Sequence, residues 1–206
     1  MAAILMGKAR DPELDSGALD AMFRLRHCVF HERLGWDVNS SDGMEIDLYD
    51  DLDPVYMIAR NESRRVEGCW RLLPTTGSYM LRDTFPELLA GEELPSDERV
   101  WELSRFAVAP TSSSDCRQAN FSDVTFSMMQ QVVQYADDNG IDAYVTVTSV
   151  ALERMLRRAG IPLQRFGDGK ARRIGRVLSV ACWIPINAQC RAAVWHDEVA
   201  FAGSAA

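Results

Sequence analysis

The chain has 206 residues, of which 47% are hydrophobic and 25% charged, so it is long enough for one globular domain with a sizeable core. Its net charge of −8 argues against general nucleic-acid binding, and no apolar run reaches the roughly 18 residues that a membrane-spanning helix needs. The N-terminal apolar stretch is too short for a signal peptide, and five cysteines without a CxxC pair suggest reduced thiols in a cytoplasmic protein, with no disulfide framework or metal site.

The first half of the chain predicts a helix, a loop and two strands. Asp15 and the apolar residues that follow it at helical spacing predict a helix to about Arg33, which Gly35 can end. A polar, acidic loop and two strands are expected next, at 37–53, 55–59 and 66–73.

The second half alternates strands and helices. A connection over 77–97 contains a short helical piece near 85–89. The elements expected after it are a strand at 100–108, a helix at 121–139, a strand at 141–147, a helix at 150–159, a short strand at 163–166, a strand at 176–186 and a last helix at 188–197. This mixed order, without a regular strand–helix–strand repeat, predicts one α/β domain over 1–206, with a twisted mixed sheet and helices on both of its faces.

The helix at the start of the chain carries a possible ligand site. Arg26 and Phe30 share one face of it, and Trp36 lies just beyond its end. The loop that follows has five carboxylates within residues 45–53. Aromatic faces beside carboxylates suit an organic cation. The alternative is an aromatic pair in the core next to a flexible, solvated acidic loop.

Two expected strands carry charged residues within apolar sequence. Arg71 must either reach solvent or pair with an acid, and an acid from 45–50 would close a site. Glu102 and Arg105 are three apart, so both reach one site only if the strand has a bulge or bend between them. Between apolar neighbours, Glu102 is expected to be partly desolvated, which raises a carboxyl pKa and suits a general base. A core glutamate paired with Arg71 or Arg105 is an equal alternative.

A further strand carries alternating threonines. Thr146 and Thr148 share a face, where their hydroxyls are either ordinary strand residues or bind a polar group in an apolar tunnel. The expected walls of this tunnel are Met128, Met129 and Leu152.

Charge is distributed unevenly along the chain. Residues 1–153 contain 27 acids and 13 Lys or Arg, whereas 154–206 contain 3 acids and 9 Lys or Arg. This basic segment either forms a solvated helix face and a strand edge protected by charge, or docks an acidic partner. The candidate docking residues are Arg154, Arg157, Arg158, Lys170, Arg172 and Arg173.

Taken together, these segments resemble the acyl-homoserine-lactone synthases, the LuxI-type autoinducer synthases. The resemblance runs from about Phe23 to Gly160. Its motifs are Arg26-His-Cys-Val-Phe30-His-Glu-Arg-Leu-Gly-Trp36, Glu45-Ile-Asp47-Leu-Tyr-Asp50, Gly68-Cys-Trp-Arg71-Leu-Leu-Pro-Thr-Thr and Trp101-Glu-Leu-Ser-Arg105-Phe. The positions that match the family's signature, in order, are Arg26, Phe30, Trp36, Asp47, Asp50, Arg71, Glu102 and Arg105.

The resemblance implies a fold similar to that of the GNAT acyltransferases. It also implies a reaction that joins an acyl thioester to S-adenosylmethionine, a co-substrate, with no cofactor. The α-amine forms an amide, and the ligand's carboxylate then closes a lactone and expels methylthioadenosine. The residues expected to bind S-adenosylmethionine are Arg26, Phe30, Trp36, Asp47, Asp50 and Phe106. The expected catalytic residues are Glu102, Arg105 and Arg71, and the expected acyl-chain pocket is Thr146, Thr148, Met128 and Leu152.

The acyl donor is expected to be acyl carrier protein. Simple coenzyme A-dependent GNAT members hold the pyrophosphate with a glycine-rich turn, whereas the matching stretch here, 116–122, has no glycine. Acyl carrier protein is acidic, so the basic segment is its expected landing site, although some family members take acyl-coenzyme A. The alternative functions are a GNAT-type N-acyltransferase acting on another amine and a non-catalytic domain that senses one of these ligands; no nucleic-acid or membrane partner is expected.

Overall fold

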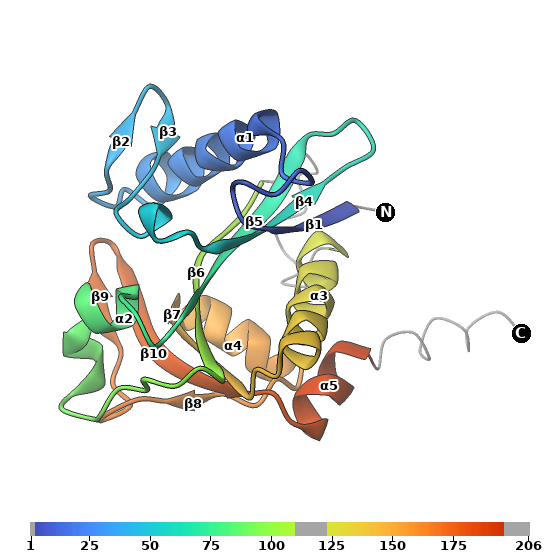
Figure 1. Cartoon of the computed structure of the whole chain (residues 1–206). Coiled ribbons are helices and arrows are strands. Elements are labelled where there is room, and N and C mark those ends of the chain that lie inside the picture. Colours follow the sequence, from blue (N-terminus) through green and yellow to red (C-terminus); the bar gives the residue numbers. More distant parts are fainter. Residues whose placement is uncertain (1–2, 110–122, 196–206) are drawn as a thin grey trace, which may run out of the picture.

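The computed structural model describes residues 3–109 and 123–195 (Figure 1). Its strands are β1 (Ala3–Gly7), β2 (Ser40–Ser41), β3 (Met44–Glu45), β4 (Val55–Arg60), β5 (Val66–Pro74), β6 (Val100–Val108), β7 (Ala143–Ser149), β8 (Gln164–Arg165), β9 (Arg172–Ile174) and β10 (Val177–Pro185). Its α-helices are α1 (Ser16–Arg26), α2 (Met80–Asp83), α3 (Asp123–Asn139), α4 (Val150–Arg158) and α5 (Ala188–Trp195). A π-helix, η1 (His27–Arg33), and two 3-10 helices, η2 (Asp50–Leu52) and η3 (Pro86–Leu89), complete the described elements.

One large mixed sheet organises the fold. Its strand order is β1-β4-β5-β6-β7-β10-β8, with β9 also paired to β10, while β2 and β3 form a separate hairpin. Neighbouring strands are antiparallel except β6 and β7, which are parallel. The predicted mixed α/β sheet is therefore confirmed. The short elements β1, β2, β3, α2 and β9 were not predicted, because strands and helices of five or fewer residues depend on tertiary pairing more than on local propensity.

Helices cover both faces of the sheet, as predicted. Because side chains alternate along a strand, Tyr56 and Ile58 of β4 pack in the core beneath α1, whereas Val55 and Met57 pack in the core shared with α3. Figure 1 shows α1 on one side of β4 and β5, with α3 on the other. The core shared with α3 also takes apolar residues from α4 and α5. These three layers agree with the expected GNAT-like architecture.

The parallel strands β6 and β7 separate halfway along their length. Their pairing runs from Val100 opposite Ala143 to Leu103 opposite Thr146, and both strands continue beyond that point. On its other edge, β6 has a bulge, because Arg105 and Phe106 together face a single residue of β5. Arg105 takes a left-handed conformation there, with φ of 57°. The sequence made a bulge or bend between Glu102 and Arg105 the condition for a shared site, and the structure has a bulge at Arg105 and Phe106. The parted strands leave room for a ligand.

The first helix changes geometry where it approaches the parted strands. The sequence predicted one helix to Arg33, and the chain is helical to that point, but its last seven residues form the π-helix η1. In this wider turn the N–H of Leu34 donates to the carbonyl of Val29, and the N–H of Trp36 donates to that of Phe30. Single π-turns often mark functional sites. Here the turn brings Trp36 back over the helix.

None of the helices in the described ranges is long and apolar enough to cross a membrane. The stretch at 116–122, on which the expectation of a missing pyrophosphate turn was based, lies outside these ranges, as do residues 121–122 and 196–197 of the expected helices.

Candidate active site

Six charged side chains from α1, the β3–η2 segment, β5 and β6 form one buried ion-pair network. Arg26 Nε lies 2.5 Å from Glu45 Oε2, and the Arg26 Nη atoms each donate to an oxygen of Asp50 at 2.8 Å. Arg71 Nη1 bridges Asp47 at 2.5 Å and Asp50 at 2.9 Å. Arg105 Nη2 binds Glu45 at 2.9 Å and Asp47 at 2.7 Å. The three guanidinium groups and three carboxylates balance in charge, which is what burial of ions requires.

Burial makes these interactions strong. No side chain of the network is more than 11% exposed. Burial alone would raise the pKa of Asp50, but the hydrogen bonds and charge of Arg26, together with Arg71, lower it below its ordinary value. Burial would likewise lower the pKa of Arg26, and the partners Asp50 and Glu45 raise it instead. Asp50 and Arg26 are therefore both ionised at neutral pH.

The network answers two questions that the sequence left open. Arg71 pairs with Asp47 and Asp50, so the predicted closure by an acid from the loop is confirmed. The alternative of a flexible, solvated loop is wrong for these two residues. Glu45 was not among the predicted site residues, but it is 0% exposed and joins Arg26 to Arg105. Its signals in the sequence were its place in the acidic segment and in the motif that begins with it.

Phe30 and Trp36 form a stacked pair beside the network. Their ring centroids are 5.2 Å apart and the planes are inclined by 24°. The guanidinium carbon of Arg105 lies 5.3 Å from the Phe30 centroid, so the ring also takes part in a cation–π contact. Trp36, which follows the end of the helix, therefore folds back over the helix face.

Glu102 is buried next to the network, but its hydrogen-bond partners are backbone groups that the sequence did not predict. It is 1% exposed, and its two oxygens accept hydrogen bonds from the backbone N–H groups of Met80 at 3.0 Å and Leu81 at 2.7 Å. Within the described residues it forms no ion pair with Arg71 or Arg105, so that alternative is wrong. Burial raises the pKa of Glu102, although these N–H groups and the nearby arginines act against the rise. The short helix α2, which supplies the N–H groups, gave no clear sequence signal.

A cavity of about 590 Å³ opens against these groups. Of the predicted residues, its walls include Phe30, Trp36, Glu102, Arg105 and Phe106. The other walls include Met80, Phe85, Ser104, Ser149 and Met155, none of which was predicted. The cavity is not lined by the other predicted residues of the network, which lie behind its wall and support it: Arg26, Asp47, Asp50 and Arg71.

A second, narrow cavity of about 60 Å³ is almost wholly apolar. It shares Ser104, Arg105, Phe106, Val147, Thr148 and Leu152 with the large cavity, so the two meet where β6 and β7 part. Thr146 lines it as predicted, with its hydroxyl donated to the Leu103 carbonyl at 2.8 Å. Met129 lines it as predicted, but Met128 does not. Met128 packs against Gly68, because one helical step turns its side chain away from the cavity.

The basic segment divides into two kinds of residue. Arg154 and Arg158, one turn apart on α4, line the large cavity together with Arg33, and none of the three has an ion pair among the described residues. The other candidates are partly committed elsewhere: Arg157 binds Glu153, and Arg172 and Lys170 bind Asp168, while Arg173 is exposed at the strand edge. The structure therefore does not show a single continuous docking patch.

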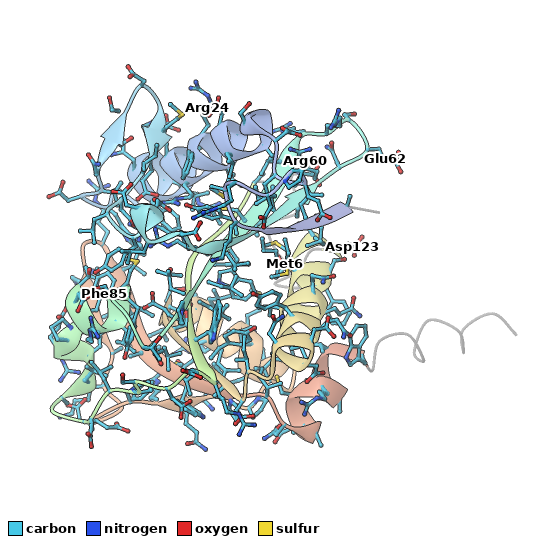
Figure 2. All side chains as sticks on the ribbon, in the orientation of Figure 1. Met6, Arg24, Arg60, Glu62, Phe85 and Asp123 are labelled. Atoms are coloured by element: carbon cyan, nitrogen blue, oxygen red, sulfur yellow. The ribbon has the colours of Figure 1, made fainter. Side chains whose placement is uncertain are left out.

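Two indole N–H groups in the cavity walls lack an acceptor. Trp36 Nε1 and Trp70 Nε1 are buried without a hydrogen-bond partner in the described residues; Trp36 lines the large cavity and Trp70 the narrow one. Buried donors are usually satisfied, so each calls for an explanation. A third such group, Arg60 Nε, lies near the β4–β5 turn, well away from Phe85 in the large cavity (Figure 2).

The fold defines the class of protein. An acyl-CoA N-acyltransferase from Pseudomonas aeruginosa has the same fold, with a TM-score of 0.56 at 15% identity over 89% of this chain and 99% of that one. The parted parallel strands with a cavity between them thus belong to a GNAT-like acyltransferase fold.

More specific relatives match nearly the whole chain. Residues 12–194 match the family model described as autoinducer synthase. An acyl-homoserine-lactone synthase of Pseudomonas aeruginosa is 45% identical over 188 residues, which cover 90% of this chain and 91% of that protein. The crystal structure of the AHL synthase LasI gives a TM-score of 0.85 at 42% identity and covers 95% of each chain. The CoA-dependent synthase BjaI, solved with SAM and isopentyl-CoA, gives 0.80 at 30% identity over 97% of this chain and 90% of that one.

The chain belongs to the acyl-homoserine-lactone synthase family. It is an acyltransferase that makes an acyl-homoserine lactone, a quorum-sensing signal, from S-adenosylmethionine and an acyl donor.

Proposed function

We propose that the large cavity binds S-adenosylmethionine and that the narrow cavity binds the acyl chain, with the reaction at their junction. The observation that carries this proposal is the position of Ser104, Arg105 and Phe106, which line both cavities. Glu102 lies on the same strand and opens to the large cavity. A wide cavity that contains charged and aromatic groups meets a narrow apolar channel beside a buried carboxylate, which suits a charged nucleophile and a fatty thioester.

The walls of the large cavity match the groups of S-adenosylmethionine. Phe30 and Trp36 offer aromatic faces to the sulfonium and adenosyl part, and the free N–H of Trp36 can donate to a ligand acceptor. Arg105 is the one guanidinium of the network that lines the cavity, so it is the group we assign to the ligand's carboxylate. The remaining residues of the network then hold Arg105 and Glu45 in place; they are Arg26, Arg71, Asp47 and Asp50.

Glu102 is the proposed general base. It takes a proton from the α-ammonium group, and the amine attacks the thioester carbonyl. The N–C bond forms, the C–S bond breaks, and the second proton of the nitrogen passes to the sulfur, which leaves as a thiol. An α-amino group has a pKa of about 7.7–8.0, so a modest base is enough at neutral pH. Beyond Leu103 the β6 edge is no longer paired with β7, so a backbone N–H there is free to stabilise the oxyanion.

The second step closes the ring. The ligand's carboxylate attacks the carbon next to the sulfonium, which forms the lactone C–O bond and breaks the C–S bond. Methylthioadenosine leaves as a neutral thioether. Arg105 keeps the carboxylate inside the cavity for this attack, which is a contribution of orientation more than of acid–base chemistry.

We propose acyl carrier protein as the preferred donor in a cytoplasmic reaction. Within the part of the chain that the structure describes, Arg33, Arg154 and Arg158 have no ion-pair partner, so they place three positive charges around the large cavity, where an acidic carrier and its phosphopantetheine arm would approach. The exposed cysteine Cys28 carries a free thiol, in keeping with a reducing compartment. The relative BjaI is CoA-dependent, so acyl-coenzyme A is the alternative donor to test in parallel.

Product analysis tests the proposed function. The protein is incubated with S-adenosylmethionine and either acyl carrier protein or coenzyme A thioesters, and mass spectrometry follows the products. We expect methylthioadenosine and an acyl lactone in equal amounts, with faster turnover from the carrier. An acylated amine without methylthioadenosine would favour a GNAT-type N-acyltransferase, and binding without turnover would favour a sensor.

A further inference from the structure

The narrow cavity is a channel with a defined far end. On the helix side its walls come from α3, α4 and α5. The α4 and α5 walls are pairs of residues four apart, which lie on one helix face: Leu152 and Leu156 of α4, and Cys190 and Val194 of α5. Both α5 residues are almost fully buried, at 1% and 0% exposure. α5 follows directly after β10 and packs alongside α3, where Gln130 Nε2 donates to the Val194 carbonyl at 3.0 Å.

The strand register shows how far the channel reaches. Thr148 and Tyr144 both line it, and they pair with Val180 and Ile184 of β10. Four residues of strand span about 13 Å. Thr148 belongs to both cavities, whereas Tyr144 and Ile184 line only the channel. The channel therefore runs along β7 from the reaction junction toward α5.

The volume of the channel limits what fits in it. A cavity needs a volume of about 10–15 Å³ for each water-sized group that it holds. The 60 Å³ of the channel is thus enough for about four to six methylene or methyl groups. The thioester carbon and its neighbour lie outside this volume, at the junction formed by Ser104 and Phe106.

We propose that Cys190 and Val194 of α5 form the end wall that sets acyl-chain length, and that the preferred chain has about six to eight carbons. This inference rests on the proposed function, because it assigns the narrow cavity to the acyl chain. The channel is apolar to its end, so each methylene that it accommodates favours binding, by about fourfold in kcat/KM. A methylene that meets the end wall loses that gain and forces the wall to move.

Substitutions at Val194 test the end wall in both directions. Val194→Ala removes two methyl groups from the wall, and Val194→Phe extends into the channel. Val180→Ala is the matched control: Val180 is 1% exposed in the same core cluster and lines neither cavity. Each protein is given S-adenosylmethionine with a series of saturated acyl thioesters, on carrier protein and on coenzyme A in separate runs, and lactones are quantified by mass spectrometry.

We expect the wild-type maximum at about six to eight carbons. Val194→Ala should move it up by about two carbons, with the ratio of the longer to the shorter product rising up to about 16-fold, and Val194→Phe should move it down. Val180→Ala should leave the profile unchanged. A wild-type maximum at a much longer chain, or a profile that Val194→Ala does not move, or one that Val180→Ala moves equally, overturns the inference. If Val194→Phe does not fold, Val194→Ala alone decides. Absence of any lactone overturns the proposed function and this inference with it.

Discussion

Replacing Glu45 by glutamine removes one negative charge from the buried ion-pair network while keeping the side-chain shape. Glu45 is 0% exposed and holds Arg26 at 2.5 Å and Arg105 at 2.9 Å, so both guanidinium groups lose a charged partner. Removing one partner of a buried ion pair costs about 3–5 kcal/mol. For a chain of this length each kcal/mol shifts Tm by about 2–4 °C, so we expect Tm to fall by about 6–20 °C.

Thermal and urea unfolding measure this loss, and Asp137→Asn is the matched control. Asp137 binds Arg191 at 2.5 Å through an equivalent carboxylate, but the two side chains are 33% and 42% exposed. An exposed pair contributes about 0–1 kcal/mol, so this variant should unfold close to the wild type. If Glu45→Gln destabilises no more than Asp137→Asn, the network does not hold Arg105 in the way described.

Three further outcomes are expected. Glu102→Gln keeps the fold but lowers kcat by about 10²–10⁴ in steady-state assays, and near wild-type turnover would remove Glu102 from the role of base. The lowered pKa of Asp50 stabilises the folded state fully above the group's ordinary pKa of 3.8 and less as pH falls below it. Urea unfolding from about pH 5 to about pH 3 should therefore show a steeper loss for wild type than for Asp50→Asn, and parallel curves would contradict this. Reversing charge at Arg154 and Arg158 should raise KM for a carrier-bound donor about tenfold, with little change for a small thioester; equal changes would refute carrier docking there.

Much of the fold was accessible from sequence because its longer elements are strongly periodic. Helix α3 and strands β5, β6 and β10 carry clear apolar patterns, and the structure has them where they were predicted. The π-helix η1 was missed because its residues differ little from an ordinary helical pattern; its geometry comes from the contacts of Phe30 and Trp36. The helix α2 has only four residues, and Glu102 caps it from a distant strand.

The site was predicted in part for a similar reason. An arginine within an apolar strand signals a buried partner, and this reasoning led correctly from Arg71 to the acidic segment. Nothing in the chain distinguishes Glu45 from the acids around it, since its role depends on Arg105 approaching from β6. The sequence indicated that Glu102 and Arg105 need a bulge or bend in the strand to reach one site. Only the register of β5 against β6 shows where the bulge lies. Likewise, Met128 and Met129 differ by one helical step, which no apolar pattern resolves.

A crystal structure of the protein with S-adenosylmethionine and a non-hydrolysable acyl thioester analogue tests the central claim most directly. We predict the methionine-derived ligand in the 590 Å³ cavity, between the Phe30–Trp36 pair and Glu102, with the acyl chain running along β7 toward α5. An amine placed far from Glu102, or an acyl chain lying outside the channel, would contradict a reaction at the junction of the two cavities.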